Sequence, residues 1–280
     1  MIPLGQSQDA RDGAVAVQAS GDVTVNFGLS VPDVRALVDT FLQTSLPALQ
    51  EAARTEARRN TEVFLKEFVR QLGATSRVSN EEFAKPDAQA SLSEALRGCA
   101  LKGEEADVAL VSRLLIERLS AVGKPLLKLV CEQAIRVLPN LTKPQIAYLA
   151  FMQYTKFVRH NGLSTLAMVE AFHALLLPLL EPGFQLSSAN RQYLASWGLI
   201  VINPVADANL LPQNMRTNYP FLPPTDDEIA AQGGLSIFKY MQEYVAVEGP
   251  TAFLTSTGQL IGMQHLSAAL GQVNMEIWIK

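Results

Sequence analysis

Between Val34 and about residue 200 the chain carries a helical pattern that glycine and proline interrupt at short intervals. Apolar residues recur three and four positions apart, which is typical of amphipathic helices, and the interruptions are typical of helix ends. Because the intervening loops are short, neighbouring helices should run antiparallel in a compact bundle. The pattern predicts helices at about 86–102, 105–121, 123–138, 143–160, 164–180 and 187–197. We therefore expect a mainly α fold.

The N-terminus departs from this pattern, because two short runs there alternate between apolar and polar residues on either side of Gly21. Such alternation around a turn pair is typical of a β-hairpin, and a lone hairpin is at best marginally stable in water. We predict that this β arm, residues 1–29, pairs with another copy of the chain or with a β-rich partner. Docking on strands expected near 245–279 is the alternative. The candidate partner-binding residues are Val15, Val17, Gln18, Gly21, Asp22, Val23, Val25 and Phe27.

Residues 30–75 predict one long helix that kinks at Pro47. The part after the kink is heavily charged, and opposite charges four positions apart, such as Glu62 and Lys66, favour an exposed helix. Its apolar stripe is narrow. Such a helix is either an ordinary bundle helix with one solvated face or a helix that packs on another domain or subunit.

The chain changes character after residue 202. Five prolines between Asn203 and Thr225 predict an extended connector. Beyond it we expect two helices, at about 226–244 with an interruption at Gly233 and Gly234, and at about 255–270. We also expect three short strands, at 245–247, 253–255 and 276–279. The expected domains are the arm (1–29), the kinked helix (30–75), a helical bundle (76–202), the connector (203–225) and a small C-terminal α/β unit (226–280).

Composition limits the classes of partner. A net charge of −4 argues against a nucleic-acid partner, because phosphate binding draws on clustered Lys and Arg. A positive mean hydropathy favours an oligomer or a surface that meets lipid or protein. The most apolar stretch, Leu163–Phe184, contains charged residues and prolines, so we expect no conventional spanning helix. The N-terminus lacks the pattern of a signal peptide, which predicts a cytoplasmic protein that is recruited to a membrane surface at most.

The sequence contains few residues in patterns that carry chemistry. His160, His173 and His265 lack metal-ligand spacing, and we expect them at helix ends or on the surface. Cys99 and Cys131 lie within helical patterns and are expected to be buried as small apolar groups. Phosphate-binding loops and nucleophile motifs are absent from the sequence. We therefore predict no catalytic residue, no metal, no cofactor and no enzymatic activity.

Several acidic residues have structural explanations. Glu104, Glu105 and Asp107 precede a helix, where negative charge is favourable. Glu117 and Glu132 lie among apolar residues, and helical spacing predicts that they pair with Arg113, Lys128 or Arg136.

A DNA-binding function is an alternative. Residues 141–148, followed by 191–202, are similar to the helix-then-strand order of winged-helix domains. A recognition helix offers several side chains to base edges and phosphates, and only Asn190, Arg191 and Gln192 qualify here. A structural role for the same pattern is favoured.

Blocks spread over most of the chain also resemble a bacterial family that is known by locus-tag labels and is often carried near phage-defence genes. These blocks are residues 18–25 with 28–30 and 33–34, then 83–89, 114–119, 132–142 and 254–261. That family has no assigned catalytic residues, so the resemblance implies none here. The Gln-Ala-x-Gly-Asp-Val block of the arm is also similar to β-forming segments of bacterial immune proteins that stack on each other or on a β-rich partner.

The combination of a β arm and apolar helices looks like that of helical, lipid-binding effectors in two-gene systems against large phages. We therefore predict a non-enzymatic, self-assembling component of bacterial antiphage defence. The arm would recruit it, and the apolar helices between about 124 and 184 would form the core and a surface that binds or destabilises a lipid membrane or phage vesicle. A protein-only sensor or adaptor and a winged-helix DNA-binding regulator are the alternatives.

Overall fold

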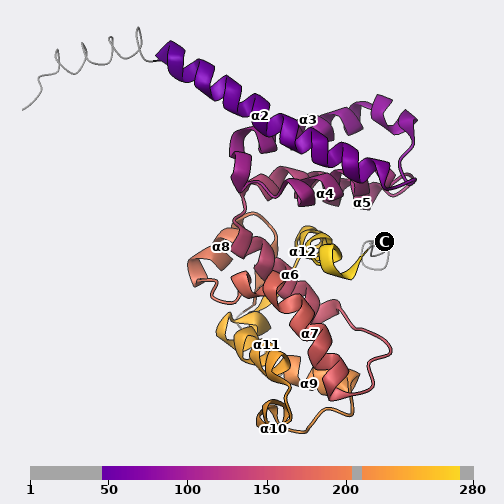
Figure 1. The fold of residues 1–280 in the computed structure, drawn as a ribbon, viewed down its shortest axis with the longest axis vertical. Coiled ribbons are helices and arrows are strands. Elements are labelled where there is room, and N and C mark those ends of the chain that lie inside the picture. Colours follow the sequence, from indigo (N-terminus) through magenta and orange to yellow (C-terminus); the bar gives the residue numbers. More distant parts are fainter. Residues whose placement is uncertain (1–45, 204–209, 272–280) are drawn as a thin grey trace, which may run out of the picture. The chain divides into compact units, whose positions relative to one another are not determined.

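The computed structural model describes residues 46–203 and 210–271 (Figure 1). The chain divides into two units, of which the first ends at Arg54 and the second begins at Thr55. Of the first unit, only residues 46–54 are described, as the start of helix α2. The candidate partner-binding residues of the arm, Val15 to Phe27, lie outside the described residues, as does the strand expected at 276–279.

The described residues confirm a mainly α fold, because eleven α-helices accompany a single sheet of two short strands. The helices are α2 (Leu46–Gly73), α3 (Pro86–Lys102), α4 (Val108–Ser120), α5 (Pro125–Val137), α6 (Lys143–Phe157), α7 (Leu166–Leu180), α8 (Ser188–Ser196), α9 (Leu210–Asn218), α10 (Asp226–Ala231), α11 (Leu235–Ala246) and α12 (Ser256–Leu270). Single turns of 3-10 helix are η2 (Asn80–Ala84), η3 (Gly103–Glu105), η4 (Leu138–Asn140), η5 (Glu181–Gly183) and η6 (Gly249–Thr251). The six helices predicted between residues 86 and 197 are thus confirmed as α3 to α8.

Local capping explains where several of these helices begin. Thr142 accepts a hydrogen bond from the backbone N–H of Gln145, and the Gln145 side chain accepts one from the N–H of Thr142, which completes a capping box at α6. Asp107 accepts from Leu110 N at 2.9 Å and so caps α4. The interpretation of this acidic cluster as a helix start is therefore confirmed at Asp107.

Helix α2 buries one narrow stripe, as its sequence predicts. Asn60, Phe64 and Phe68 are buried one turn apart, and the two phenylalanine rings stack with centroids 5.8 Å apart. On its exposed side, ion pairs link residues three positions apart, for example Arg59 with Glu56 at 2.8 Å. Because such exposed pairs contribute little, the buried stripe holds this helix to the fold.

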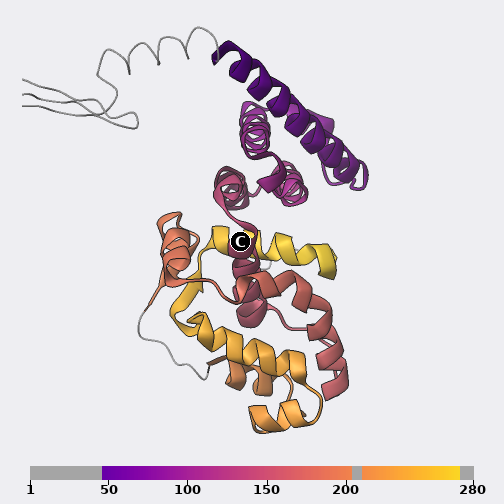
Figure 2. The ribbon, with the colours of Figure 1, turned by 60° about the vertical axis from the view of Figure 1, so that its left-hand side comes forward.

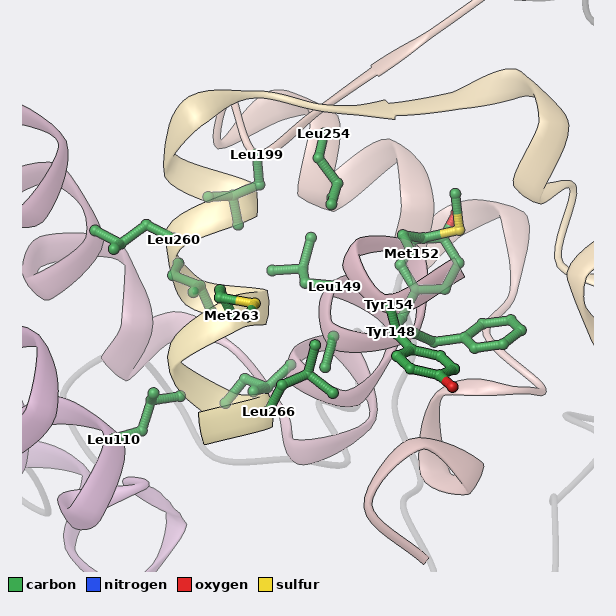
Figure 3. Packing of buried hydrophobic residues seen from close by; sticks show 14 of the residues in the cluster. Leu110, Tyr148, Leu149, Met152, Tyr154, Leu199, Leu254, Leu260, Met263 and Leu266 are labelled. Atoms are coloured by element: carbon green, nitrogen blue, oxygen red, sulfur yellow. The ribbon is translucent and has the colours of Figure 1, made fainter. Parts of the chain in front are cut away.

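Helix α6 is the central element of the second unit, because α12, α7, η5 and strand β2 all pack on it. Figures 1 and 2 show α7 and α12 beside α6. Its residues from Gln145 to Tyr154 are all buried. In the surrounding cluster, the side chains of Leu149 from α6 and Met263 and Leu266 from α12 lie together (Figure 3). A Cβ added at Gly262 of α12 would lie only 2.5 Å from the Leu149 carbonyl oxygen. Glycine at this position therefore lets the two helix backbones approach closely.

Two expectations for the C-terminal part are wrong. Residues 245 and 246 end helix α11 instead of forming a strand, because Tyr240, Met241 and Tyr244 continue a buried helical face up to that point. The connector is not extended throughout, since α9 lies within it. Its Pro212 is the third residue of the helix, where the first turn tolerates a missing N–H.

The strand expected at 253–255 is confirmed as β2 (Ala252–Leu254), and its partner comes from far away in the sequence. Strand β1 (Ile200–Ile202) pairs with it antiparallel, with Ile200 opposite Leu254. The described residues beyond 225 belong to the same unit as the bundle, because α12 packs on α4, α5 and α6.

Candidate functional site

Helix α7 presents an unbroken apolar surface to solvent. All fifteen of its residues are described, and every exposed one is apolar. We call this surface the α7 stripe; its members are Ala167, Met168, Ala171, Ala174, Leu175 and Pro178. Their spacing places them along one side of the helix. Leu175 is 63% exposed and Met168 is 43% exposed, so the largest side chains of the stripe reach into solvent.

The opposite side of α7 packs on the fold. Val169, Leu176 and Leu180 are fully buried there, which leaves the stripe as the only uncovered face of the helix. Glu170, the helix's one charged residue, is turned to α11, where its carboxylate accepts hydrogen bonds from Ser236 N at 2.9 Å and Ile237 N at 3.2 Å. A carboxylate is favourable at a helix N-terminus. This arrangement removes the charge of Glu170 from the stripe.

His173 is the other polar residue of α7, and it is also used inside the fold. Its Nδ1 lies 2.7 Å from Val169 O, to which it donates, and its Nε2 accepts from the Tyr154 hydroxyl at 3.1 Å. Burial lowers the pKa of His173 to about 4, so the imidazole is neutral at pH 7. The expectation of a helix-end or surface position is therefore wrong for His173, because its helical register points it toward α6.

The stripe belongs to the described helix that, by length and composition, is apolar enough to cross a membrane. That segment is Leu166–Gly183, which combines α7 and η5. The expectation that this stretch forms no conventional spanning helix stays a prediction, because length and composition alone do not test it. Pro178 removes one N–H near the C-terminal end without ending the helix before Leu180.

The acidic residues of the bundle pair differently from the sequence prediction. Glu117 binds Arg77 at 3.2 Å, and Glu132 binds the fully buried Arg118 at 3.0 Å. The expected partners on their own helices are wrong, because the helix faces that carry these residues pack on other elements. Arg77 in the segment after α2 and Arg118 of α4 therefore supply the charges.

The polar residues expected of a recognition helix are mostly used inside the fold. Arg191 is buried and binds Glu248 at 2.7 Å and Leu186 O at 3.0 Å. The side-chain oxygen of Asn190 accepts from Gln145 at 2.8 Å. Neither side chain is available to a base edge without loss of these bonds.

The described residues contain no cluster of three or more histidine, cysteine or acidic side chains that could hold a metal ion. Both cysteines are free and buried, as predicted. Burial raises the pKa of the Cys99 thiol to about 12, and it also raises that of Cys131. A thiol with a raised pKa stays protonated at pH 7 and is a poor nucleophile.

The comparisons with known proteins place the chain in a family. A family model described as ":-like" matches residues 28–232. The chain belongs to this family. The description carries no activity, and the match covers helices α2 to α10. No curated protein and no solved structure matches the chain.

The sequence predicts two candidate surfaces, and the structure describes only the region of the second one. The partner-binding residues predicted in the arm lie outside the described residues. The sequence also predicts a lipid-contacting surface between about 124 and 184, the range that contains α7, but does not identify the residues of that surface. The only local signal was the low charge of residues 163–184, which is typical of a buried helix as well.

Proposed function

We propose that the protein is a non-catalytic, self-assembling component of bacterial antiphage defence that docks the α7 stripe on a lipid surface. The single observation that carries the lipid part is the stripe itself, whose six exposed residues include no polar side chain. The role in antiphage defence rests on the resemblance of the sequence blocks described above to a bacterial family that is often carried near phage-defence genes. Assembly and recruitment rest on the predicted arm.

The chemistry of the stripe favours lipid over water as its environment. Transfer of apolar surface out of water is favourable by roughly 25 cal/mol per Å². Interfacial helices commonly add Lys and Arg that attract anionic lipids, whereas α7 contains neither residue. Binding should therefore depend on apolar burial and respond little to salt or to anionic lipid.

Flotation of the purified protein with neutral phosphatidylcholine vesicles tests this proposal. We expect the wild type to float, and to float equally with anionic vesicles and at raised salt. Leu175→Glu places a charge in the stripe and should abolish flotation. Leu129→Glu is a matched control, because Leu129 on α5 is also 63% exposed but lies outside the stripe. The control should float as the wild type does.

Two outcomes would contradict the lipid part. If the wild type binds no vesicle, the stripe faces protein or water, and the protein-only sensor or adaptor is favoured. If both charged variants lose flotation equally, the lipid surface is not specific to α7.

Self-assembly is tested separately, in the full chain. Val23→Asp with Val25→Asp places like charges on the predicted strand and should lower the native mass to that of a smaller species. Val23→Thr with Val25→Thr keeps β-favouring residues and should retain the wild-type mass. A native mass unchanged by the aspartates would show that the arm does not assemble the protein.

A further inference from the structure

A pocket of about 290 Å³ lies where the C-terminal end of α2 meets α4 and α12. Three arginines line it: Arg70 from α2, Arg77 just beyond α2, and Arg113 from α4. Its volume is at the lower end of the range for small-molecule sites. The pocket lies outside the α7 stripe and shares no residue with it.

Arg113 is held in position but leaves most of its donors unused. Its Nε donates to the backbone oxygen of Gln264 at 3.0 Å, which ties the guanidinium to α12. Among the described residues, no hydrogen bond or ion pair joins its two terminal nitrogens to another group. A guanidinium carries five N–H donors, so four of them stay available to a ligand.

The other two arginines already have carboxylate partners. Arg77 binds Glu117 at 3.2 Å, and Arg70 binds Glu67 through two hydrogen bonds of 2.8 and 2.6 Å. These pairs neutralise both charges locally and hold the guanidiniums at the pocket. Arg113 is therefore the cation at this pocket that lacks a bonded carboxylate among the described residues.

The charges and burial around Arg113 also favour an anionic ligand. Burial lowers the pKa of Arg113, and the neighbouring charge of Arg70 lowers it further, although Asp107 and Glu67 act in the opposite direction. Two guanidiniums close enough to repel each other are stabilised by an anion between them. An anionic group that binds Arg113 would supply the missing partner.

The remaining lining defines the rest of the ligand. Thr75 and Gln264 contribute polar groups, and the Glu117 carboxylate can accept hydrogen bonds from ligand hydroxyls. Among the described residues that line the pocket, none is aromatic, so it offers no ring on which a nucleobase could stack. The planar arginine fork matches phosphate oxygens.

We propose that this pocket binds a small phosphorylated polyol, of the sugar phosphate class, with its phosphate on Arg113 and its hydroxyls toward Glu117. The ligand would connect α2, α4 and α12 at one point. This inference does not depend on the proposed lipid function.

Isothermal titration of the full chain tests the proposal, with glucose 6-phosphate, inorganic phosphate, glucose and AMP as probes. We expect glucose 6-phosphate to bind more tightly than inorganic phosphate or AMP, and glucose not to bind. Vesicles that contain phosphatidic acid distinguish a lipid source of the phosphate. They should not compete with glucose 6-phosphate.

Three variants locate the site. Arg113→Gln should weaken glucose 6-phosphate binding by about tenfold or more, because a charge-assisted bond is lost. Arg77→Gln changes an exposed side chain, keeps a hydrogen-bond donor that can reach the buried Glu117, and should weaken binding by a smaller factor. Arg97→Gln is the control, since Arg97 is an exposed arginine on α3 outside the pocket, and it should bind as the wild type does.

The alternative outcomes overturn the proposal in whole or in part. Absence of glucose 6-phosphate binding to the wild type, or binding that neither pocket variant weakens, removes the site. Equal binding of inorganic phosphate removes the polyol part. Tighter binding of AMP, or competition by phosphatidic acid vesicles, replaces the ligand class.

Discussion

Helices α6 and α7 follow each other in the chain, have fifteen residues each and are both rich in apolar residues, yet they have opposite surroundings. Ten consecutive residues of α6 are buried on every side of the helix, whereas α7 buries four residues on one side and exposes the α7 stripe on the other. The more apolar of the two helices is therefore the less buried one.

The difference follows from the neighbours and not from the helices themselves. Helix α6 is covered by α12 on one side and by α7, η5 and β2 on others. Helix α7 packs on α6 and α11, and its stripe has no cover among the described residues. An apolar residue stabilises the folded chain only where a neighbour removes it from water. The stripe can instead stabilise an association.

The largest expected effect is the difference in unfolding free energy between a substitution in α6 and one in α7. Phe151→Ala in α6 removes a ring that packs against Phe184 and Tyr240, and should lower the free energy of unfolding by about 3–5 kcal/mol. Leu175→Ala in the α7 stripe should change it by less than about 0.5 kcal/mol, because Leu175 is exposed. Urea denaturation of both variants measures the difference.

If Leu175→Ala destabilised the protein as strongly as Phe151→Ala, the stripe would already be covered in solution. A dependence of that effect on protein concentration would identify another copy of the chain as the cover. Without such dependence, the cover would come from the same chain.

Local sequence patterns were enough to predict most helices but not this contrast. Local signals such as the capping box at Thr142 and Gln145, together with glycine and proline, place α3 to α8 to within a few residues of their observed ends. Which side of α7 is covered depends on α11, some seventy residues later in the chain. A period of 3.6 residues contains no information about that partner.

The same limit explains the other errors. Strands β1 and β2 pair across about fifty residues, so no local turn signals their register. The pocket arginines come from α2, the segment after it, and α4. Helical spacing alone predicts that Arg113 pairs with Glu117 on its own helix, and it contains no information about the other two elements that form the pocket.

The next effect concerns the contact between α6 and α7, where His173 meets Tyr154. The pKa of His173 is about 4 in the folded protein, below the ordinary value of 6.5 that the unfolded chain has. The unfolded state therefore binds the proton more readily. The free energy of unfolding therefore includes a contribution from neutral His173 that is fully present above pH 6.5. Protonation of the unfolded chain removes this contribution as the pH falls toward 4, by about 3 kcal/mol in total.

The pH dependence of unfolding tests this contribution. His173→Gln cannot titrate, so between pH 7 and pH 4 its unfolding free energy should fall less steeply than that of the wild type. The overall stability of the variant does not enter the comparison, because only the slopes are compared. Parallel slopes would mean that His173 is not buried as a neutral group between the two helices.

The smallest effect tests why α6 is covered at all. Gly262→Ala places a Cβ 2.5 Å from the Leu149 carbonyl oxygen, so α12 must move away from α6. Overpacking of this kind outweighs the better helix propensity of alanine, and we expect a net loss of about 1–2 kcal/mol. Gly73→Ala in α2 is the control, because nothing lies within 4 Å of its added Cβ, and it should be neutral or stabilising by up to about 1 kcal/mol. Hydrogen exchange should become faster in α6 for Gly262→Ala and stay unchanged there for Gly73→Ala. If both alanines stabilised the protein equally, close approach of α12 would not be what buries α6, and the contrast with α7 would need another cause.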